Sequence, residues 1–192
     1  MYSKEYSKRL VRFNGTPQYQ AELTKLGDLL DLKSYHSVLD YGFGVGTALM
    51  EITKKTKHTF GYDVNTFEDS IVPDHPIWKG GKERFDRIYF MHSIAHIPNI
   101  SDVLKQLMTD NLAPDGKIIV ITPNKLWLRA KNGEDVKSDD TAIEHFTMRT
   151  LYNLFRGIGM TCDVGQYSYD EGTDFVYKDI ELKERLYSVS HL

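Results

Sequence analysis

The segment that most constrains the fold of this chain reads Val38-Leu39-Asp40-Tyr41-Gly42-Phe43-Gly44-Val45-Gly46-Thr47. Apolar residues lead into an acidic residue, and alternate glycines then lead into a helical pattern, which predicts a buried strand, a tight turn and a helix. Glycine at such a turn permits positive φ and lets a ligand lie against the backbone. The first N–H groups of the helix have no partner within it, so they add hydrogen-bond donors. We therefore expect a ligand site at the end of this strand.

Asp40 narrows the kind of ligand, because it stands two residues before the first glycine and places a carboxylate at the strand tip. A carboxylate repels a phosphate and accepts hydrogen bonds from a hydroxyl or an ammonium group. A ribose or a cationic amino acid therefore fits better than a pyrophosphate. The spacing agrees, since a dinucleotide-binding turn reads G-x-G-x-x-G and Thr47 breaks that pattern. A nucleotide-dependent oxidoreductase is the less favoured alternative, although Asp63 at the tip of the next strand would by itself suit NAD equally well.

Composition limits the class of protein further. A length of 192 residues suits one domain with a substantial core. The net charge of −3 predicts no broad basic surface for nucleic acid. The single cysteine, Cys162, fits a reducing compartment, and the N-terminus has no apolar leader. We expect a soluble, cytoplasmic protein with no membrane association, and its oligomeric state stays open.

The pattern along the chain predicts an N-terminal arm and helix over residues 1–34 that cap a domain over residues 35–192. Thr16-Pro17 marks the start of that helix. Further helices are expected over 45–55, 101–108 and 147–156. Strands are expected over 37–40, 58–63, 85–91, 116–121, 161–167 and 185–190, with a short candidate at 76–78. Strands that alternate with helices predict an α/β fold with a parallel sheet. The last two strands have no helix between them, so they predict a hairpin with one antiparallel strand.

These motifs together resemble a class I S-adenosylmethionine-dependent methyltransferase, of the small-molecule group that includes ubiquinone-biosynthesis-like enzymes. The segments that carry the resemblance are Val38–Thr47, Gly61-Tyr62-Asp63, Phe85–Pro98 and Leu112–Asn124, in the family's order over about residues 35–160. The resemblance implies a Rossmann-like, doubly wound, mostly parallel sheet of seven strands with one antiparallel strand. It also implies S-adenosyl-L-methionine as cofactor and methyl transfer to an oxygen or nitrogen atom of a small-molecule acceptor.

The resemblance further implies which residues hold the cofactor. The glycine segment would line its methionine part, Asp63 its ribose, and the segment from Met91 would pass beneath it; the residues predicted to bind are Asp40, Tyr41, Gly42, Phe43, Gly44, Gly46, Asp63, Val64, Met91 and His92. Phe43 departs from the family, which favours a small residue there, so crowding near the cofactor is expected. Trp78 or Ile77 is a candidate for stacking on the adenine, and a place in the core is an equal alternative for Trp78.

Three histidines are candidates for the base that removes a proton from the acceptor: His92, His96 and His145. A histidine titrates near neutral pH and is the usual choice for this role. Each also has a structural alternative, since His96 matches a packing position of the family and His145 precedes a helix cap at Thr147. His92 and His96 follow a strand and no carboxylate or cysteine converges on them, so we predict no metal site.

Two further hypotheses concern regulation and activity. The long connection from Asn124 to Thr141 predicts either a lid over the acceptor or a solvated loop. In the family's Glu-His pattern Ala95 replaces the glutamate, and with the bulky Phe43 this keeps a second function open. That alternative is a catalytically silent cofactor-binding or partner-activating subunit of the same fold.

Overall fold

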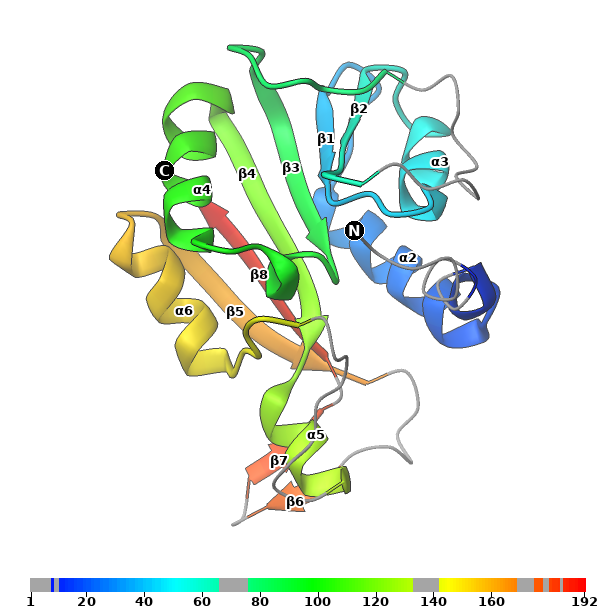
Figure 1. Cartoon of the computed structure of the whole chain (residues 1–192), viewed down its shortest axis with the longest axis vertical. Coiled ribbons are helices and arrows are strands. Elements are labelled where there is room, and N and C mark those ends of the chain that lie inside the picture. Colours follow the sequence, from blue (N-terminus) through cyan, green and yellow to red (C-terminus); the bar gives the residue numbers. More distant parts are fainter. Residues whose placement is uncertain are drawn as a thin grey trace.

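A computed structural model describes residues 8, 11–65, 76–132, 142–168, 175–177, 180–183 and 185–192, with side chains placed for all of these except 129–132, 175–177 and 180–182. The central sheet has six strands. Their order across the sheet is β2 (Thr59–Tyr62), β1 (Val38–Tyr41), β3 (Phe85–Met91), β4 (Leu112–Pro123), β8 (Arg185–His191) and β5 (Thr161–Tyr167) (Figure 1). The first four strands are parallel, and β8 lies antiparallel between β4 and β5. The predicted Rossmann-like fold and the C-terminal hairpin are confirmed.

The prediction of seven strands is wrong, because the candidate at 76–78 forms no strand. Only Ile77 pairs there, in an isolated parallel bridge with Gly61 of β2. Two hydrogen bonds make this bridge: the Gly61 N–H donates to the carbonyl of Pro76 and the Trp78 N–H donates to the carbonyl of Gly61, at 3.0 and 2.8 Å. Gly80 then turns the chain away at a φ of 81°. Pairing therefore stops after one residue.

Helices cover both faces of the sheet. The helices α2 (Pro17–Leu30) and α3 (Thr47–Thr53) lie on one face. The helices α4 (Ile100–Gln106) and α6 (Met148–Gly157) lie on the other, together with the π-helical turn η2 (Leu107–Asn111) (Figure 1). A short 3₁₀ turn, η1 (Ile94–His96), follows β3. Among the helices that the structure describes, none is long and apolar enough to cross a membrane.

The helix starts follow from local sequence. The Thr16 side chain accepts a hydrogen bond from the Tyr19 N–H, and Pro17 occupies the first turn of α2, where it sacrifices no helical hydrogen bond. The Thr147 side chain accepts one from the Thr150 N–H, while the Thr150 hydroxyl bonds back to the N–H of Thr147. Both starts were predicted from the sequence.

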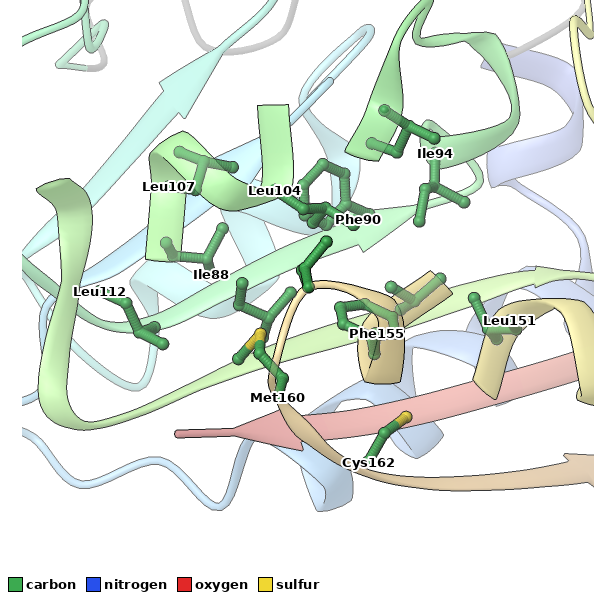
Figure 2. Packing of buried hydrophobic residues seen from close by; sticks show 14 of the residues in the cluster. Ile88, Phe90, Ile94, Leu104, Leu107, Leu112, Leu151, Phe155, Met160 and Cys162 are labelled. Atoms are coloured by element: carbon green, nitrogen blue, oxygen red, sulfur yellow. The ribbon is translucent and has the colours of Figure 1, made fainter. Parts of the chain in front are cut away.

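Each face of the sheet has its own apolar core. Under α4, η2 and α6, side chains of the helices pack on β3 and β4; Figure 2 shows Ile88, Phe90, Leu104, Leu107, Leu151 and Phe155 in this layer. Under α2 and α3, a second cluster joins Leu26, Leu30 and Ile52 to Tyr89 and Ile119 of the sheet. Successive side chains of a strand point to opposite faces of the sheet, so β1, β3 and β4 contribute residues to both clusters.

Two connections contain more structure than predicted. The supposed loop from Asn124 to Thr141 begins with the helix α5 (Lys125–Asn132), in which Trp127 is buried, while residues 133–141 lie outside the described residues. The connection between the last two strands of the sheet contains a hairpin of β6 (Phe175–Tyr177) and β7 (Ile180–Leu182). Figure 1 shows α5 beside this hairpin, beyond the end of the sheet.

A test of the core uses helix α6. Phe155 is fully buried against the sheet, whereas Tyr152 on the same helix is 44% exposed. Phe155→Ala is expected to lower the free energy of unfolding by about 3–5 kcal/mol, because it leaves a cavity that the sheet cannot fill. Urea denaturation monitored by circular dichroism gives this value. Tyr152→Ala is the control, with an expected change of about 0.5 kcal/mol or less; equal losses in both variants would contradict the packing described here.

Candidate functional site

The glycine turn between β1 and α3 has a backbone conformation that residues with a side chain rarely adopt. Gly42, Gly44 and Gly46 have φ values of 88°, 57° and 93°. The Gly42 N–H donates to the carbonyl of Tyr62 at 2.6 Å, which fixes the turn to the end of β2. The Gly46 N–H donates to the carbonyl of Phe43 at 2.9 Å and closes the turn. The alternate glycines therefore form the expected turn at the carboxyl edge of the sheet.

Asp63 joins this turn to the tip of β2. One carboxylate oxygen of Asp63 accepts a hydrogen bond from the Gly44 N–H at 2.9 Å, and the other accepts one from the Asn65 N–H at 2.9 Å. The Asp63 side chain is partly exposed, and Val64 beside it is 81% exposed. The Asn65 side chain also donates to the oxygen that accepts from the Asn65 N–H, at 3.4 Å. The oxygen bonded to Gly44 can accept a second hydrogen bond, so Asp63 is still able to bind a hydroxyl donor of a ligand.

The end of β3 forms the floor of the same site. Met91 is the last residue of the strand and is buried, and the next residue, His92, has a φ of 60°. Ser93 follows, and its hydroxyl donates to the carbonyl of Tyr41. A Cβ atom on Gly42 would lie 2.3 Å from the Cβ of Ser93, so only glycine fits at this contact. The β3 tip and the glycine turn are thus packed directly on each other.

The side chain of Phe43 packs against the neighbouring strand, where its ring contacts Gly61 of β2. A Cβ atom on Gly61 would lie 2.8 Å from Cδ1 of Phe43 and 2.9 Å from Cδ2 of Leu49. The absence of a side chain at Gly61 therefore makes room for the aromatic ring. The departure of Phe43 from the family pattern is matched by a glycine on the neighbouring strand.

Asp40 is buried beneath the turn, with 1% of its surface exposed. The Tyr89 hydroxyl donates to its Oδ2 at 2.7 Å. Burial raises the pKa of Asp40 to about 8; the hydrogen bond from Tyr89 opposes this rise and the charge of Asp63 adds to it. Asp40 therefore exchanges a proton in the neutral range, and its negative charge at the strand tip depends on pH.

Aromatic side chains form a row on the other face of β1. The ring of Tyr41 lies 4.6 Å from that of Tyr62 and 5.1 Å from that of Phe90. Trp78 continues the row at 5.6 Å from Tyr62, is 7% exposed, and donates its ring N–H to Glu83 at 3.0 Å. Trp78 thus belongs to the core. Ile77 remains 43% exposed next to β2.

A buried carboxylate lies behind His92. Glu22 of α2 has no exposed surface, and its Oε2 lies 2.5 Å from Nε2 of His92. Arg185, the first residue of β8, donates from Nε to the Glu22 Oε1 at 2.6 Å. Burial alone would raise the pKa of Glu22, but its electrostatic interactions and hydrogen bonds with His92 and Arg185 together hold that pKa below the usual value. Glu22 is therefore an ionised group inside the protein, and His92 and Arg185 are among its partners.

The other two histidines lie on a different pair of segments. His96 ends the turn η1, and His145 precedes the N-cap of α6. These segments are joined, because the carbonyl of Ala95 accepts hydrogen bonds from the N–H groups of Ile143 and Glu144 at 2.8 and 3.1 Å. Both histidines are partly buried. The three candidate bases are thus divided, with His92 against α2 and the others beside the β3–α4 and α5–α6 connections.

The N-terminal segment also reaches the glycine turn. The Asn14 side chain donates to the Thr47 hydroxyl at 2.7 Å, and Thr47 is the first residue of α3. Tyr19 of α2 is buried and hydrogen bonds with the backbone of Ala48. Two side chains from the start of the chain therefore contact the helix that follows the turn.

Sequence reasoning missed Glu22, Arg185 and Ser93. A signal for Glu22 was present: the buried face of α2 contains Tyr19, Glu22, Leu26 and Leu30, at helical spacing. A charged residue within such an apolar stripe predicts a buried charge with a partner. For Arg185 and Ser93 no local signal exists, because their contacts depend on how the strands are ordered.

The comparisons with known proteins agree with this fold. Residues 11–163 match the family described as methyltransferase domain. A SAM dependent methyltransferase from Archaeoglobus fulgidus has a TM-score of 0.73 at 15% identity, over 96% of this chain and 98% of that chain. One from Aquifex aeolicus gives 0.64 at 16%, over 99% and 98%. The complex of DhpI with SAM and HEP gives 0.63 at 13%, over 98% and 94%. A comparison with curated proteins finds no match.

The first test at this site concerns the contact of Gly42 with Ser93. Gly42 and Gly80 have φ values of 88° and 81°, but a Cβ atom would meet Ser93 only at Gly42 and nothing within 4 Å at Gly80. Gly80→Ala is expected to cost about 1–2 kcal/mol of stability from the left-handed backbone alone. Gly42→Ala adds a steric cost of about 1–3 kcal/mol. Chemical denaturation of both variants measures the difference, and equal costs would show that the turn is not packed on β3 as described.

The second test uses the buried Asp40. An unfolded aspartate loses its proton near pH 3.9, whereas the native pKa is about 8. Between these values the unfolded chain binds fewer protons, so the Asp40 contribution to the free energy of unfolding falls by up to about 1.4 kcal/mol per pH unit as the pH rises. Asp40→Asn removes this loss. We expect its stability relative to the unaltered protein to increase from pH 5 to pH 8 in urea titrations; a pH-independent difference would contradict the assignment.

Proposed function

Because this chain belongs to the methyltransferase domain family, we propose that it transfers a methyl group from S-adenosyl-L-methionine to an oxygen or nitrogen atom of a small-molecule acceptor. The observation that carries the proposal is the turn in which Gly42, Gly44 and Gly46 all have positive φ while the Gly44 N–H meets the carboxylate of Asp63. S-adenosylmethionine is the cofactor of this enzyme family, and DhpI is a solved neighbour in complex with it.

The chemistry of the turn fits this cofactor. Asp63 accepts one hydrogen bond on Oδ2 and two from Asn65 on Oδ1, at 2.9 and 3.4 Å. Oδ2 has capacity for one ribose hydroxyl, and Oδ1 can accept the other in place of the long bond from the Asn65 side chain. The exposed Val64 lies next to it, where it is available to the nucleoside. The backbones of Tyr41, Phe43 and the glycines would line the methionine part. Asp40 beneath them supplies negative charge for a cationic ligand when it is ionised.

The cofactor, when bound, supplies a methyl group on a positively charged sulfur. The protein then has to hold the acceptor atom in line with that group, because positioning alone supplies a large part of such an acceleration. Met91 and His92 are the residues we assign to this task, since Met91 ends β3 and His92 follows it, directly before Ser93, which contacts the glycine turn. The acceptor would lie above this strand end.

The proposal of an oxygen or nitrogen acceptor rests on the available bases. Such an acceptor loses a proton during transfer, and His92, His96 and His145 are the histidines near the carboxyl ends of β3 and β4. His92 lies against the carboxylate of Glu22, and its side chain is 24% exposed. The net charge of −3 supports a small molecule over a nucleic acid.

The direct test incubates the full chain with methyl-labelled S-adenosylmethionine and a panel of phenols, alcohols, carboxylates, amines and imidazoles. Formation of S-adenosylhomocysteine above the acceptor-free rate, with label in one of these acceptors, is the expected result. Cofactor binding without transfer to any acceptor would instead favour the silent subunit. Preference for NADH over S-adenosylmethionine in calorimetry would overturn the cofactor assignment.

The ribose contact has its own test. Asp63→Ala is expected to weaken the affinity for S-adenosylmethionine by about 1.5–3 kcal/mol, or roughly 10- to 150-fold in Kd, because it removes a charged acceptor. Isothermal titration calorimetry measures the change. Asp102→Ala, an exposed acid on α4, is the control and should leave Kd unaltered. Unchanged affinity in the Asp63 variant would exclude the ribose role.

A further inference from the structure

We infer that Glu22 and Arg185 are positioning residues that hold His92 as a neutral base, with its proton on Nε2 and with Nδ1 left to accept the proton of the methyl acceptor. This inference rests on the proposed function and assigns roles in that same site. It selects His92 from the three candidate histidines.

The first observation is the direction of the His92 ring. Nε2 points to the fully buried Oε2 of Glu22 at 2.5 Å. An ionised carboxylate only accepts hydrogen bonds, so Nε2 carries the proton. The ring edge of His92 also meets the ring of Phe13, with 6.2 Å between the centroids. Nδ1 is the remaining nitrogen, on a side chain that is 24% exposed at the end of β3.

The second observation is the charge balance. Arg185 is a permanent cation and donates to the other oxygen of Glu22 at 2.6 Å, so the two charges compensate each other. The positive charge of Arg185 thus offsets the negative charge of Glu22 beside the ring, and Nδ1 has a lone pair for a proton only in a neutral ring with its proton on Nε2. With Arg185 in place, Glu22 can orient the ring and leave it neutral. Glu22 and Arg185 therefore act together on the ring of His92.

The third observation is the backbone of His92. A φ of 60° costs a residue other than glycine about 1–2 kcal/mol. The His92 N–H still donates to the carbonyl of Ile121 at 2.9 Å, and Ser93 is pinned to Tyr41. The surrounding structure thus holds an unfavourable conformation that turns this side chain toward Glu22. Strain of this kind is concentrated at functional sites.

The proton balance of the step is complete. The lone pair of the acceptor heteroatom forms a bond to the methyl carbon while the carbon–sulfur bond breaks. The bonding pair stays on sulfur, which becomes a neutral thioether. The proton of the acceptor O–H or N–H moves to Nδ1 of His92. The ring is then a cation beside Glu22, whose carboxylate stabilises it until the proton leaves to solvent.

The first experiment is nitrogen-15 NMR of the histidine rings in the full chain with S-adenosylmethionine bound at pH 7.5. Long-range proton–nitrogen correlations distinguish the two neutral tautomers and the imidazolium, and His92→Gln identifies the signal. We expect a neutral ring with its proton on Nε2. A proton on Nδ1 alone, or on both nitrogens, would overturn the inference whether or not an acceptor has been found.

The second experiment is Glu22→Gln. An amide has one accepting oxygen, and Arg185 can only donate, so the oxygen should turn to Arg185 and the NH₂ group to His92. Nε2 then has to accept, and the proton moves to Nδ1. We expect the tautomer to switch and kcat for the acceptor found in the panel to fall about 100-fold or more, with KM within about threefold. Asp28→Asn, the same loss of charge at an exposed position of α2, is the control and should change neither.

The outcomes separate this inference from the proposed function. An inactive wild-type protein contradicts the proposed function, whereas an active Glu22→Gln variant with a switched tautomer contradicts only the role of His92. An unchanged tautomer in that variant shows that Glu22 does not position the ring. If the variant does not fold, Arg185→Lys serves instead. The lysine retains the positive charge, so we expect His92 to keep its neutral form with the proton on Nε2. If His92 is an imidazolium in this variant, loss of methyl transfer would support the charge balance, and unchanged activity would overturn the inference.

Discussion

A carboxylate without contact to water requires partners, and the pairing of Glu22 is the constraint on which the rest of this structure depends. Its two oxygens meet His92 at the end of β3 and Arg185 at the start of β8. The N-terminal helix, the floor of the site and the last strand are therefore aligned by one residue. A shift of any of these elements would leave a charge buried without compensation, which is far more costly than a loss of apolar contact.

The glycine turn is held in a comparable way, by contacts from the ends of two neighbouring strands. Gly42 is tied to β2 through the carbonyl of Tyr62 and packed on Ser93 after β3, and Asp63 receives the N–H of Gly44. These contacts set the shape of the turn before a ligand arrives. A preformed turn reduces the ordering that binding requires, so more of the interaction energy appears as affinity.

Much of the fold could be predicted from the sequence, because its signals are local. The alternate glycines, the caps at Thr16 and Thr147 and the lack of a helix before β8 each act within a few residues. The missing strand at 76–78 could not be predicted, since one bridge with Gly61 and the burial of Trp78 depend on packing. In the site, Asp40 and Asp63 were recognisable at strand ends. Ser93 and Arg185 were not, because strand order alone brings them to their partners.

The place of β8 in the sheet has a consequence for how the molecule is made. The strand lies between β4 and β5, and Arg185 within it is separated from Glu22 by 163 residues of chain. During synthesis on the ribosome, α2, the glycine turn and His92 all emerge while the gap beside β4 is still open. Glu22 then has no Arg185 to pair with, so burial of α2 against the sheet is unfavourable until β8 has been translated. The interior of the site is consequently closed by a segment translated long after α2, and a nascent chain cannot hold His92 in its final setting before that strand has inserted.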